Sequence, residues 1–186
     1  MGHLLDRLLD RLATGLLIVD VQEKLMGIID PNEELAERIC LLLKGCQLLD
    51  IPCILSEQYP KGLGPTISLI ANTVQPLLRF EKTAFSCMRE AQFGQQLLSY
   101  APTSWIVVGI EAHVCVLQTV RDLVSSGKQV IVPIDAVSSR TAMDRRTAIG
   151  EMRTMGVRIT TCETILFELL QDAKDPLFKT MSQLVK

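Results

Sequence analysis

The chain has 186 residues, of which 48% are hydrophobic, 22% charged and 4% aromatic. This length fits a single domain over residues 1–186, which can bury a core without disulfides or a structural metal. The sequence has 19 basic and 21 acidic residues and a net charge of −2. It therefore lacks a basic footprint for nucleic acid, and its apolar content argues against a disordered chain.

The N-terminal segment alternates leucine with Asp and Arg over residues 4–12. This pattern predicts a short amphipathic helix, because a signal peptide needs an uninterrupted apolar region. No stretch of the sequence approaches the ~18 apolar residues of a membrane span. We therefore expect no association with a membrane.

Short apolar runs alternate with helical patterns along the rest of the chain. Strands are predicted at residues 16–21, 52–55, 77–81, 105–110, 129–134 and 157–161, and helices at 33–50, 92–100, 113–126, 145–155 and from there to the end. Strands that are apolar on both faces and alternate with helices form right-handed βαβ units. The predicted fold class is α/β, a three-layer α/β/α sandwich around a parallel sheet.

Six cysteines are the unusual feature of the composition, at positions 40, 46, 53, 87, 115 and 162. They form no CxxC pair, they are sparser than in disulfide-rich secreted domains, and the sequence holds only two histidines. We expect reduced thiols and hence a cytoplasmic protein. No metal and no other cofactor are expected.

Several common active-site motifs are absent. The first predicted strand is followed by no glycine, so the dinucleotide-binding fingerprint is missing. The sequence has no GxSxG of serine hydrolases and no HExxH of zinc proteases. A nucleotide-binding oxidoreductase is therefore unsupported.

Chemically useful side chains follow the carboxyl ends of three predicted strands, where open α/β sheets bind ligands. Asp20 ends the first strand, Lys82 follows the third, and Cys115 lies in the opening turn of the helix after the fourth. Free N–H groups and the dipole at a helix start are expected to lower a thiol pKa below ~8.5 and can form an oxyanion hole. With Asp20 as base and Lys82 as orienter, Cys115 is a candidate nucleophile.

Structural interpretations of these residues remain open. A cysteine at the start of a helix is usually a small buried side chain, and an aspartate at a strand end is as often a cap or ion-pair member as a catalyst. Lys82 can equally pair with Glu81 or another acid. His113 is interpreted as a polar residue of the helix start rather than as a base.

Four blocks of sequence, taken together and in order, resemble the isochorismatase-like or cysteine hydrolase superfamily. They are residues 17–22 (LIVDVQ), 56–66 (SEQYPKGLGPT), 80–85 (FEKTAF) and 109–116 (GIEAHVCV). The second block is similar to the YcaC-type branch and the isochorismatase domain-containing proteins. The resemblance covers a core of about residues 14–170 and implies a six-stranded parallel sheet in the order 3-2-1-4-5-6.

The resemblance also implies the roles of individual residues. It places a catalytic triad at Asp20, Lys82 and Cys115. It further implies a cis peptide at Ile110–Glu111, which would turn the N–H of Glu111 or Ala112 toward the same point as the Cys115 N–H and so form the oxyanion hole.

The sequence differs from the nicotinamidases and the true isochorismatases of this superfamily, and these differences narrow the predicted function. Nicotinamidases hold a metal with histidines in the loop after the second strand, but residues 56–59 (SEQY) contain none. True isochorismatases cleave a vinyl ether and do not need the cysteine. The predicted function is therefore a cysteine hydrolase that cleaves an amide-type or related carbonyl bond of a small molecule through a Cys115 thioester.

Other expectations concern binding and partners. Gln22, Glu57 and Tyr59 follow strand ends beside the triad and are expected to bind the substrate. The resemblance implies a homo-oligomer, for which residues 4–12 and 166–170 are candidate interfaces, with core packing as the alternative. A second hypothesis for the same fold is a non-catalytic or redox-sensing binding protein.

Overall fold

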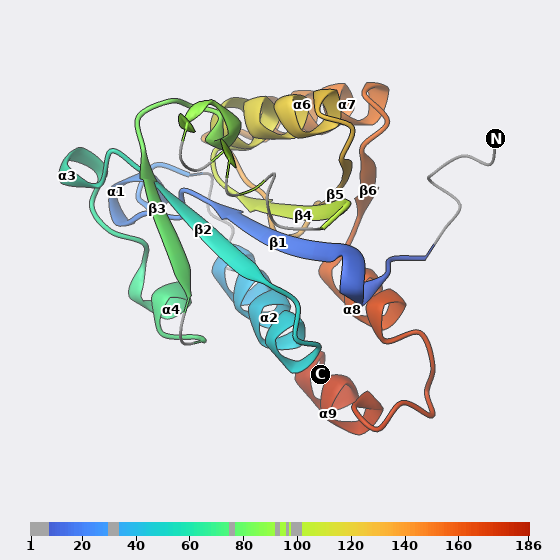
Figure 1. Ribbon diagram of the computed structural model, residues 1–186. Coiled ribbons are helices and arrows are strands. Elements are labelled where there is room, and N and C mark those ends of the chain that lie inside the picture. The colour runs from blue at the N-terminus through green and yellow to red at the C-terminus, as the bar shows by residue number, and fades with distance from the viewer. Residues whose placement is uncertain (1–7, 30–33, 75–76, 92–93, 96, 98–101) are drawn as a thin grey trace.

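A parallel sheet of six strands forms the centre of the computed structural model, which describes residues 8–29, 34–74, 77–91, 94, 95, 97 and 102–186 (Figure 1). The strands are β1 Thr14–Val19, β2 Cys53–Gln58, β3 Leu78–Lys82, β4 Ser104–Gly109, β5 Gln129–Pro133 and β6 Arg158–Thr160. Neighbouring strands are parallel, and their order is β3-β2-β1-β4-β5-β6. The predicted fold class and strand order are confirmed.

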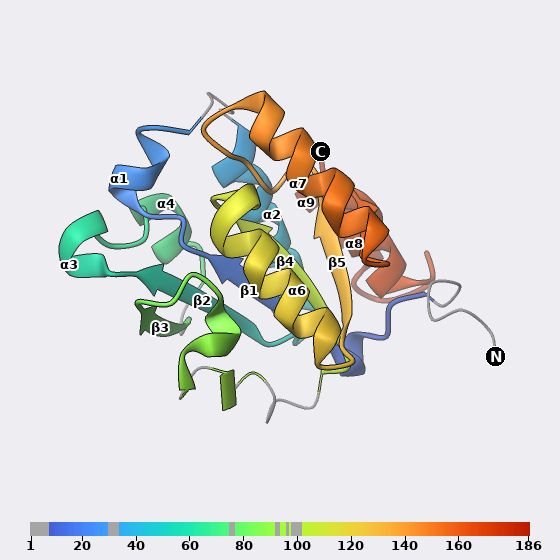
Figure 2. The same cartoon turned by 90° about the horizontal axis from the view of Figure 1, so that it is seen from above.

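Helices cover both faces of this sheet. They are α1 Glu23–Met26, α2 Glu34–Leu48, α3 Pro60–Leu63, α4 Ser68–Ala71, α6 Leu117–Ser125, α7 Ala142–Thr154, α8 Cys162–Leu170 and α9 Phe178–Leu184. Helices α6 and α7 lie on one face, and α2, α8 and α9 lie on the other (Figures 1 and 2). The arrangement is a three-layer sandwich.

The two central strands are buried at every position because helices cover both of their faces. In β1, Leu16 and Ile18 pack into the cluster of α2 and α8, whereas Leu17 and Val19 pack into the cluster of α6 and α7. This alternation explains why the predicted strands appear as continuous apolar runs.

Most elements begin or end a few residues from their predicted bounds, and two of these differences have a clear local reason. Strand β2 continues to Gln58, beyond the predicted end at Leu55, because its last three residues are polar and carry no hydrophobic signal. Helix α7 begins at Ala142, since the Thr141 side chain accepts a hydrogen bond from the Asp144 N–H and caps the helix.

The predicted N-terminal helix is wrong over residues 8–10, which are not helical, and residues 4–7 lie outside the described residues. A short 3₁₀ turn, Arg11–Ala13, follows instead. Leu9 is buried, and its N–H donates to Glu168 Oε1 at 2.8 Å, so this segment is tied to α8. The helix predicted over 92–100 falls largely outside the described residues.

Residues 166–170 belong to α8, and their leucine side chains are buried in the core beside α2. This contact supports the core-packing interpretation of that segment. Among the residues that the structure describes, no helix is both long enough and apolar enough to cross a membrane.

Candidate active site

The register of the sheet brings three strand ends together. Val19 at the end of β1 is paired with Ser56 of β2 and with Gly109 of β4. At the outer edge, Gln58 of β2 is paired with Lys82 of β3. Helices α1 and α3, which follow β1 and β2, lie side by side beyond these ends (Figure 1). The residues just after the strands therefore share one edge of the sheet.

A buried ion pair lies at this edge. Lys82 Nζ is 2.6 Å from Asp20 Oδ2, and neither side chain has any solvent exposure. The same ammonium donates to Gln58 Oε1 at 2.6 Å and to the carbonyl oxygens of Ala84 and Phe85 at 3.2 and 3.1 Å. Burial lowers the pKa of Lys82, but the Asp20 carboxylate and neighbouring groups outweigh it, so that this pKa is raised. Lys82 is thus held as a cation.

Asp20 is fixed through its backbone and through both carboxylate oxygens. Its φ of +52° lies in the left-handed region, which aspartate tolerates better than most residues. The Ser56 hydroxyl donates to Oδ1 at 2.7 Å while Lys82 holds Oδ2. The Cys115 thiol lies near enough to this carboxylate for Asp20 to raise the pKa of the thiol. The three predicted triad residues therefore meet.

Cys115 lies in a π-helical turn, Ala112–Val116, that leads directly into α6. Only 6% of the surface of Cys115 is exposed to solvent. Burial raises the pKa of the thiol, the Asp20 carboxylate raises it further, and Lys82 lowers it only in part. The expectation of a depressed thiol pKa is therefore wrong, because burial and a nearby carboxylate outweigh the helix start. The resting site holds a neutral thiol.

Gly109 allows β4 to approach β1 at this point. Its φ is +117°, and a Cβ added here would lie 2.1 Å from the Val19 carbonyl oxygen. The next N–H, that of Ile110, donates to the same oxygen at 2.9 Å. Only glycine fits this close approach, which places the Cys115 turn beside Asp20.

The backbone before Cys115 offers fewer free N–H donors for an oxyanion hole than the family resemblance implies. The Ile110–Glu111 peptide bond is cis. The Ala112 N–H donates to the Ser138 carbonyl at 2.7 Å, so Ala112 does not serve as a free oxyanion donor, and this expectation is corrected. Among the described residues, the N–H groups of Glu111 and Cys115 have no acceptor outside their own turn.

Gln22 is fully buried, and both ends of its amide are engaged by the protein. Its Nε2 donates to the carbonyl oxygens of Gln58 and Gly64 at 3.0 and 2.6 Å, and its Oε1 accepts from the Gln58 N–H at 2.7 Å. These bonds hold the loop after β2 against the end of β1. They give Gln22 a structural role in place of the expected substrate contact.

Glu57 is occupied in a similar way. Its Oε1 accepts from the N–H and the hydroxyl of Thr66, both at 2.7 Å, and forms an ion pair with Arg79 at 3.4 Å. Tyr59 differs because its side chain remains 55% exposed. Of the three expected substrate-binding residues, Tyr59 alone keeps an exposed side chain.

Three residues at the site were missed by the sequence reasoning. Ser56 and Gln58 lie two positions apart on β2 and therefore on one face, where each binds a member of the ion pair. The Cys87 thiol donates to the Ser56 hydroxyl at 3.5 Å, and burial raises the pKa of Cys87 to about 11. The two-residue spacing of Ser56 and Gln58 was the signal that could have found them.

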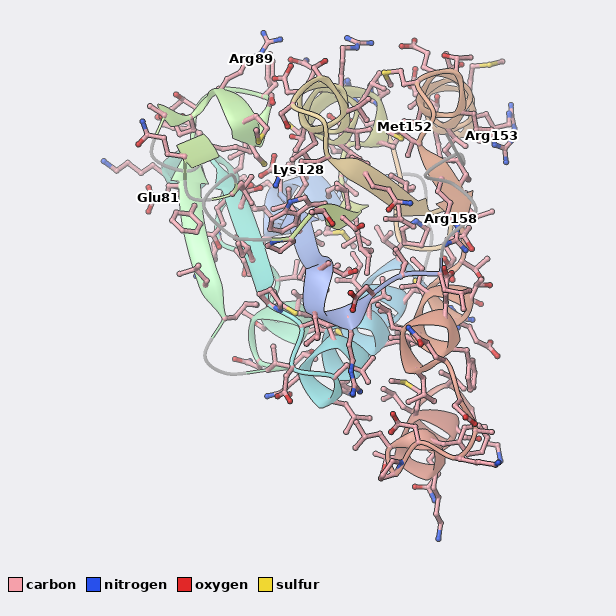
Figure 3. The ribbon with its side chains drawn as sticks, turned by 45° about the vertical axis from the view of Figure 1, so that its right-hand side comes forward. Glu81, Arg89, Lys128, Met152, Arg153 and Arg158 are labelled. Atoms are coloured by element: carbon pink, nitrogen blue, oxygen red, sulfur yellow. The ribbon has the colours of Figure 1, made fainter. Side chains whose placement is uncertain are left out.

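A cavity of about 280 Å³ opens beside the end of β3, between Lys82 and Tyr59. Glu81 also lines it, at the edge of the sheet seen in Figure 3. His113 lies apart from this cavity and contacts Ser139 through Nδ1 at 3.0 Å. In the described part of the chain, no group of three or more His, Cys, Asp or Glu side chains is placed to hold a metal ion.

Comparison with known proteins places this chain in a family. The isochorismatase domain matches residues 14–164. Isochorismatase domain-containing protein 2 of Danio rerio is 41% identical over 171 residues, which cover 91% of this chain and 85% of the relative. The structure of MAR1 ribonuclease from Caenorhabditis elegans has a TM-score of 0.90 at 36% identity and covers 96% and 92% of the two chains.

A more distant structure shares the fold. YcaC from Pseudomonas aeruginosa, solved with hexane-2,5-diol and covalent acrylamide, has a TM-score of 0.88 at 18% identity and covers 97% of this chain and 96% of YcaC. The matched family domain spans Asp20, Lys82 and Cys115, and the relative in Danio rerio is similar along almost the same length. The chain therefore belongs to the isochorismatase family.

Proposed function

We propose that the protein is a cysteine hydrolase that cleaves an amide-type carbonyl bond of a small molecule. Membership of the isochorismatase family supports a hydrolase-type function. The observation that carries the finer proposal is the nearness of the Cys115 thiol to a fully buried carboxylate, Asp20, which raises the pKa of the thiol and which Lys82 and Ser56 hold by its two oxygens. This is the arrangement of a nucleophile, its base and the groups that orient the base.

The proposed first step couples proton transfer to bond formation. Because its pKa is raised, the Cys115 thiol must lose its proton as it reacts. Asp20 accepts this proton while Sγ forms a bond to the carbonyl carbon, and the π electrons move to the carbonyl oxygen. The N–H groups of Glu111 and Cys115, which have no acceptor outside their own turn, stabilise the resulting oxyanion.

In the remaining steps, the Asp20 carboxyl group both donates and accepts a proton. When the C–N bond breaks, Asp20 gives its proton to the leaving amine, and a thioester on Cys115 remains. Asp20 then takes a proton from water as the water oxygen attacks the thioester carbon. Breakage of the C–S bond releases the carboxylic acid, and the proton returns to Cys115.

Lys82 acts on Asp20 rather than on the substrate. Its ammonium has four acceptors around it and a raised pKa, so it is not available as a nucleophile. The positive charge stabilises the ionised carboxylate that the first step needs. We therefore assign Lys82 the role of an orienting and charge-stabilising residue.

Two other functions remain as alternatives. A redox-sensing or binding protein would use Cys115 without forming an acyl intermediate. RNA is a second candidate substrate because MAR1 ribonuclease from Caenorhabditis elegans is 36% identical to this chain. Both alternatives are separable from amide hydrolysis by the covalent species formed on Cys115.

The test combines turnover with intact-protein mass spectrometry. The purified protein is given p-nitrophenyl acetate, a panel of primary amides and a fluorogenic RNA oligonucleotide. Hydrolysis of an ester or amide, with a transient acyl mass on Cys115, is the expected result. Both the hydrolysis and the acyl mass should disappear in Cys115→Ser. They should persist in Cys162→Ser, which removes a buried thiol outside the site.

Three results would contradict the proposal. Turnover that persists in Cys115→Ser would exclude the cysteine nucleophile. Oxidation of Cys115 by peroxide, with no acyl mass from any substrate, would favour the redox-sensing alternative. Cleavage of the RNA without reaction of the amides or the ester would reassign the substrate.

A further inference from the structure

The outer face of α7 carries a cavity that is separate from the strand-end site. Its volume is about 530 Å³, and its lining residues are Ile134, Ala142, Arg145, Arg146, Ile149, Gly150 and Arg153. Three of these residues are arginines and none is acidic. Figure 3 shows Arg153 on the outer side of α7, pointing away from the sheet.

The described arginines fall into two groups. Those outside α7 each form an ion pair with a carboxylate: Arg11, Arg38, Arg79, Arg89, Arg121, Arg140 and Arg158. The three arginines of the cavity form no ion pair with any residue that the structure describes. Among the described residues, the arginine side chains that form no ion pair therefore all line this cavity.

The acidic residues of α7 itself do not neutralise this charge. Asp144 Oδ2 accepts from the Thr141 hydroxyl at 2.7 Å at the start of the helix. Glu151 lies 3.1 Å from Arg121 of α6. Both carboxylates are therefore engaged away from the cavity.

Arg145 is anchored at the base of the cavity. Its Nη2 donates to the carbonyl oxygen of Ile134, and its buried Nε has no hydrogen-bond partner among the described residues. A buried donor without an acceptor is uncommon in folded proteins and costs free energy. This unsatisfied donor belongs to a guanidinium group that lines the cavity.

We propose that this cavity binds a small organic phosphate monoester. Guanidinium groups match phosphate oxygens with paired hydrogen bonds, and three positive charges suit a dianion. The side chains of Ile134, Ala142 and Ile149 form apolar walls for the organic part of the ligand. The cavity is larger than a bare phosphate needs, which favours an ester over the free ion. This inference does not depend on the function of Cys115.

The test is a calorimetric titration with phenyl phosphate at pH 7.5 and fixed salt, where a phosphate monoester with a second pKa near 6 is a dianion. We expect one saturable site, with weaker binding of inorganic phosphate and of benzoate. Arg146→Gln and Arg153→Gln should each weaken binding by about tenfold, the effect of losing one charge-assisted hydrogen bond. Both side chains are exposed and unpaired, so unchanged melting temperatures should accompany the loss.

Arg11→Gln is the matched control, because it removes the same charge from a residue outside the cavity. An equal loss of affinity in Arg11→Gln would show a general charge effect and overturn the proposal. Absence of saturable binding of phenyl phosphate would overturn it as well. An RNA oligonucleotide that binds through Arg146 and Arg153 while phenyl phosphate does not would reassign the surface to nucleic acid.

Discussion

Lys82 Nζ lies 2.6 Å from Asp20 Oδ2, and neither side chain is exposed to solvent. Removing one partner from such a pair leaves the other charge buried without compensation. The ion pair therefore couples the stability of the fold to the chemistry of the site. Its two members come from β3 and from the end of β1, which are separated by the whole of β2 in the sheet.

Lys82→Met is expected to destabilise the protein by about 3–5 kcal/mol, the usual cost of breaking a buried pair. Asp20→Asn combined with Lys82→Met should recover part of this loss, because no unpaired charge remains. Urea unfolding of the three proteins measures both effects. A loss below about 1 kcal/mol in Lys82→Met, typical of exposed pairs, would contradict the burial of this ion pair.

Asp20→Asn should make Cys115 more reactive toward iodoacetamide while it abolishes hydrolysis. The Asp20 carboxylate raises the pKa of the thiol chiefly through its charge, so its removal lowers that pKa. A pKa lower by one raises the thiolate fraction at a given pH about tenfold. Labelling rates between pH 6 and 9 measure the change, with Cys115→Ala as background. Slower labelling in Asp20→Asn would show that the carboxylate does not oppose the thiolate.

Ser56→Ala is expected to slow acylation of Cys115 by p-nitrophenyl acetate roughly ten- to a hundredfold, because a hydrogen bond to a charged group contributes roughly 1.5–3 kcal/mol. KM should stay near its original value, since Ser56 positions Asp20 and does not meet the substrate. Ser56→Thr keeps the hydroxyl and should restore the rate. If Ser56→Thr is as slow as Ser56→Ala, packing rather than the hydrogen bond explains the loss.

Cys87 should make the protein less stable in alkaline solution. Burial raises the pKa of its thiol from 9.0 to about 11, so the folded protein retains a proton that the unfolded chain loses. The stabilisation is complete below pH 9 and declines as the pH rises toward 11, by up to roughly 2.7 kcal/mol. Urea unfolding at pH 8 and 10.5 should show a smaller decline in Cys87→Ala. An equal decline in both proteins would assign the effect to other groups.

Gly109→Ala should destabilise the fold and slow the labelling of Cys115. A side chain at φ +117° costs roughly 1–3 kcal/mol in backbone strain, and the contact with the Val19 carbonyl adds to it. Gly127→Ala is the matched control, because its φ is +81° but no atom lies within 4 Å of the added Cβ. Thermal unfolding should separate the two variants. Equal melting temperatures would mean that β4 can move away from β1 at no cost.

The apolar runs of the sequence determined the layered fold. Residues 16–19 and 105–108 are apolar without interruption, and this pattern arises because helices cover both faces of β1 and β4. The placement of Asp20, Lys82 and Cys115 at or just beyond strand ends was also expected from the sequence, since the carboxyl ends of parallel strands share one edge. The order of the strands came from the family resemblance rather than from the pattern.

Tertiary structure alone decided the electrostatics and the secondary contacts of the site. The thiol pKa of Cys115 is raised because burial and Asp20 act on it together, and neither effect can be derived from its place at a helix start. Gln22 and Glu57 bind a loop that closes over them, so side chains expected to face substrate became structural. A sequence shows which groups follow a strand, whereas the pKa and the partners of each group depend on what packs against it.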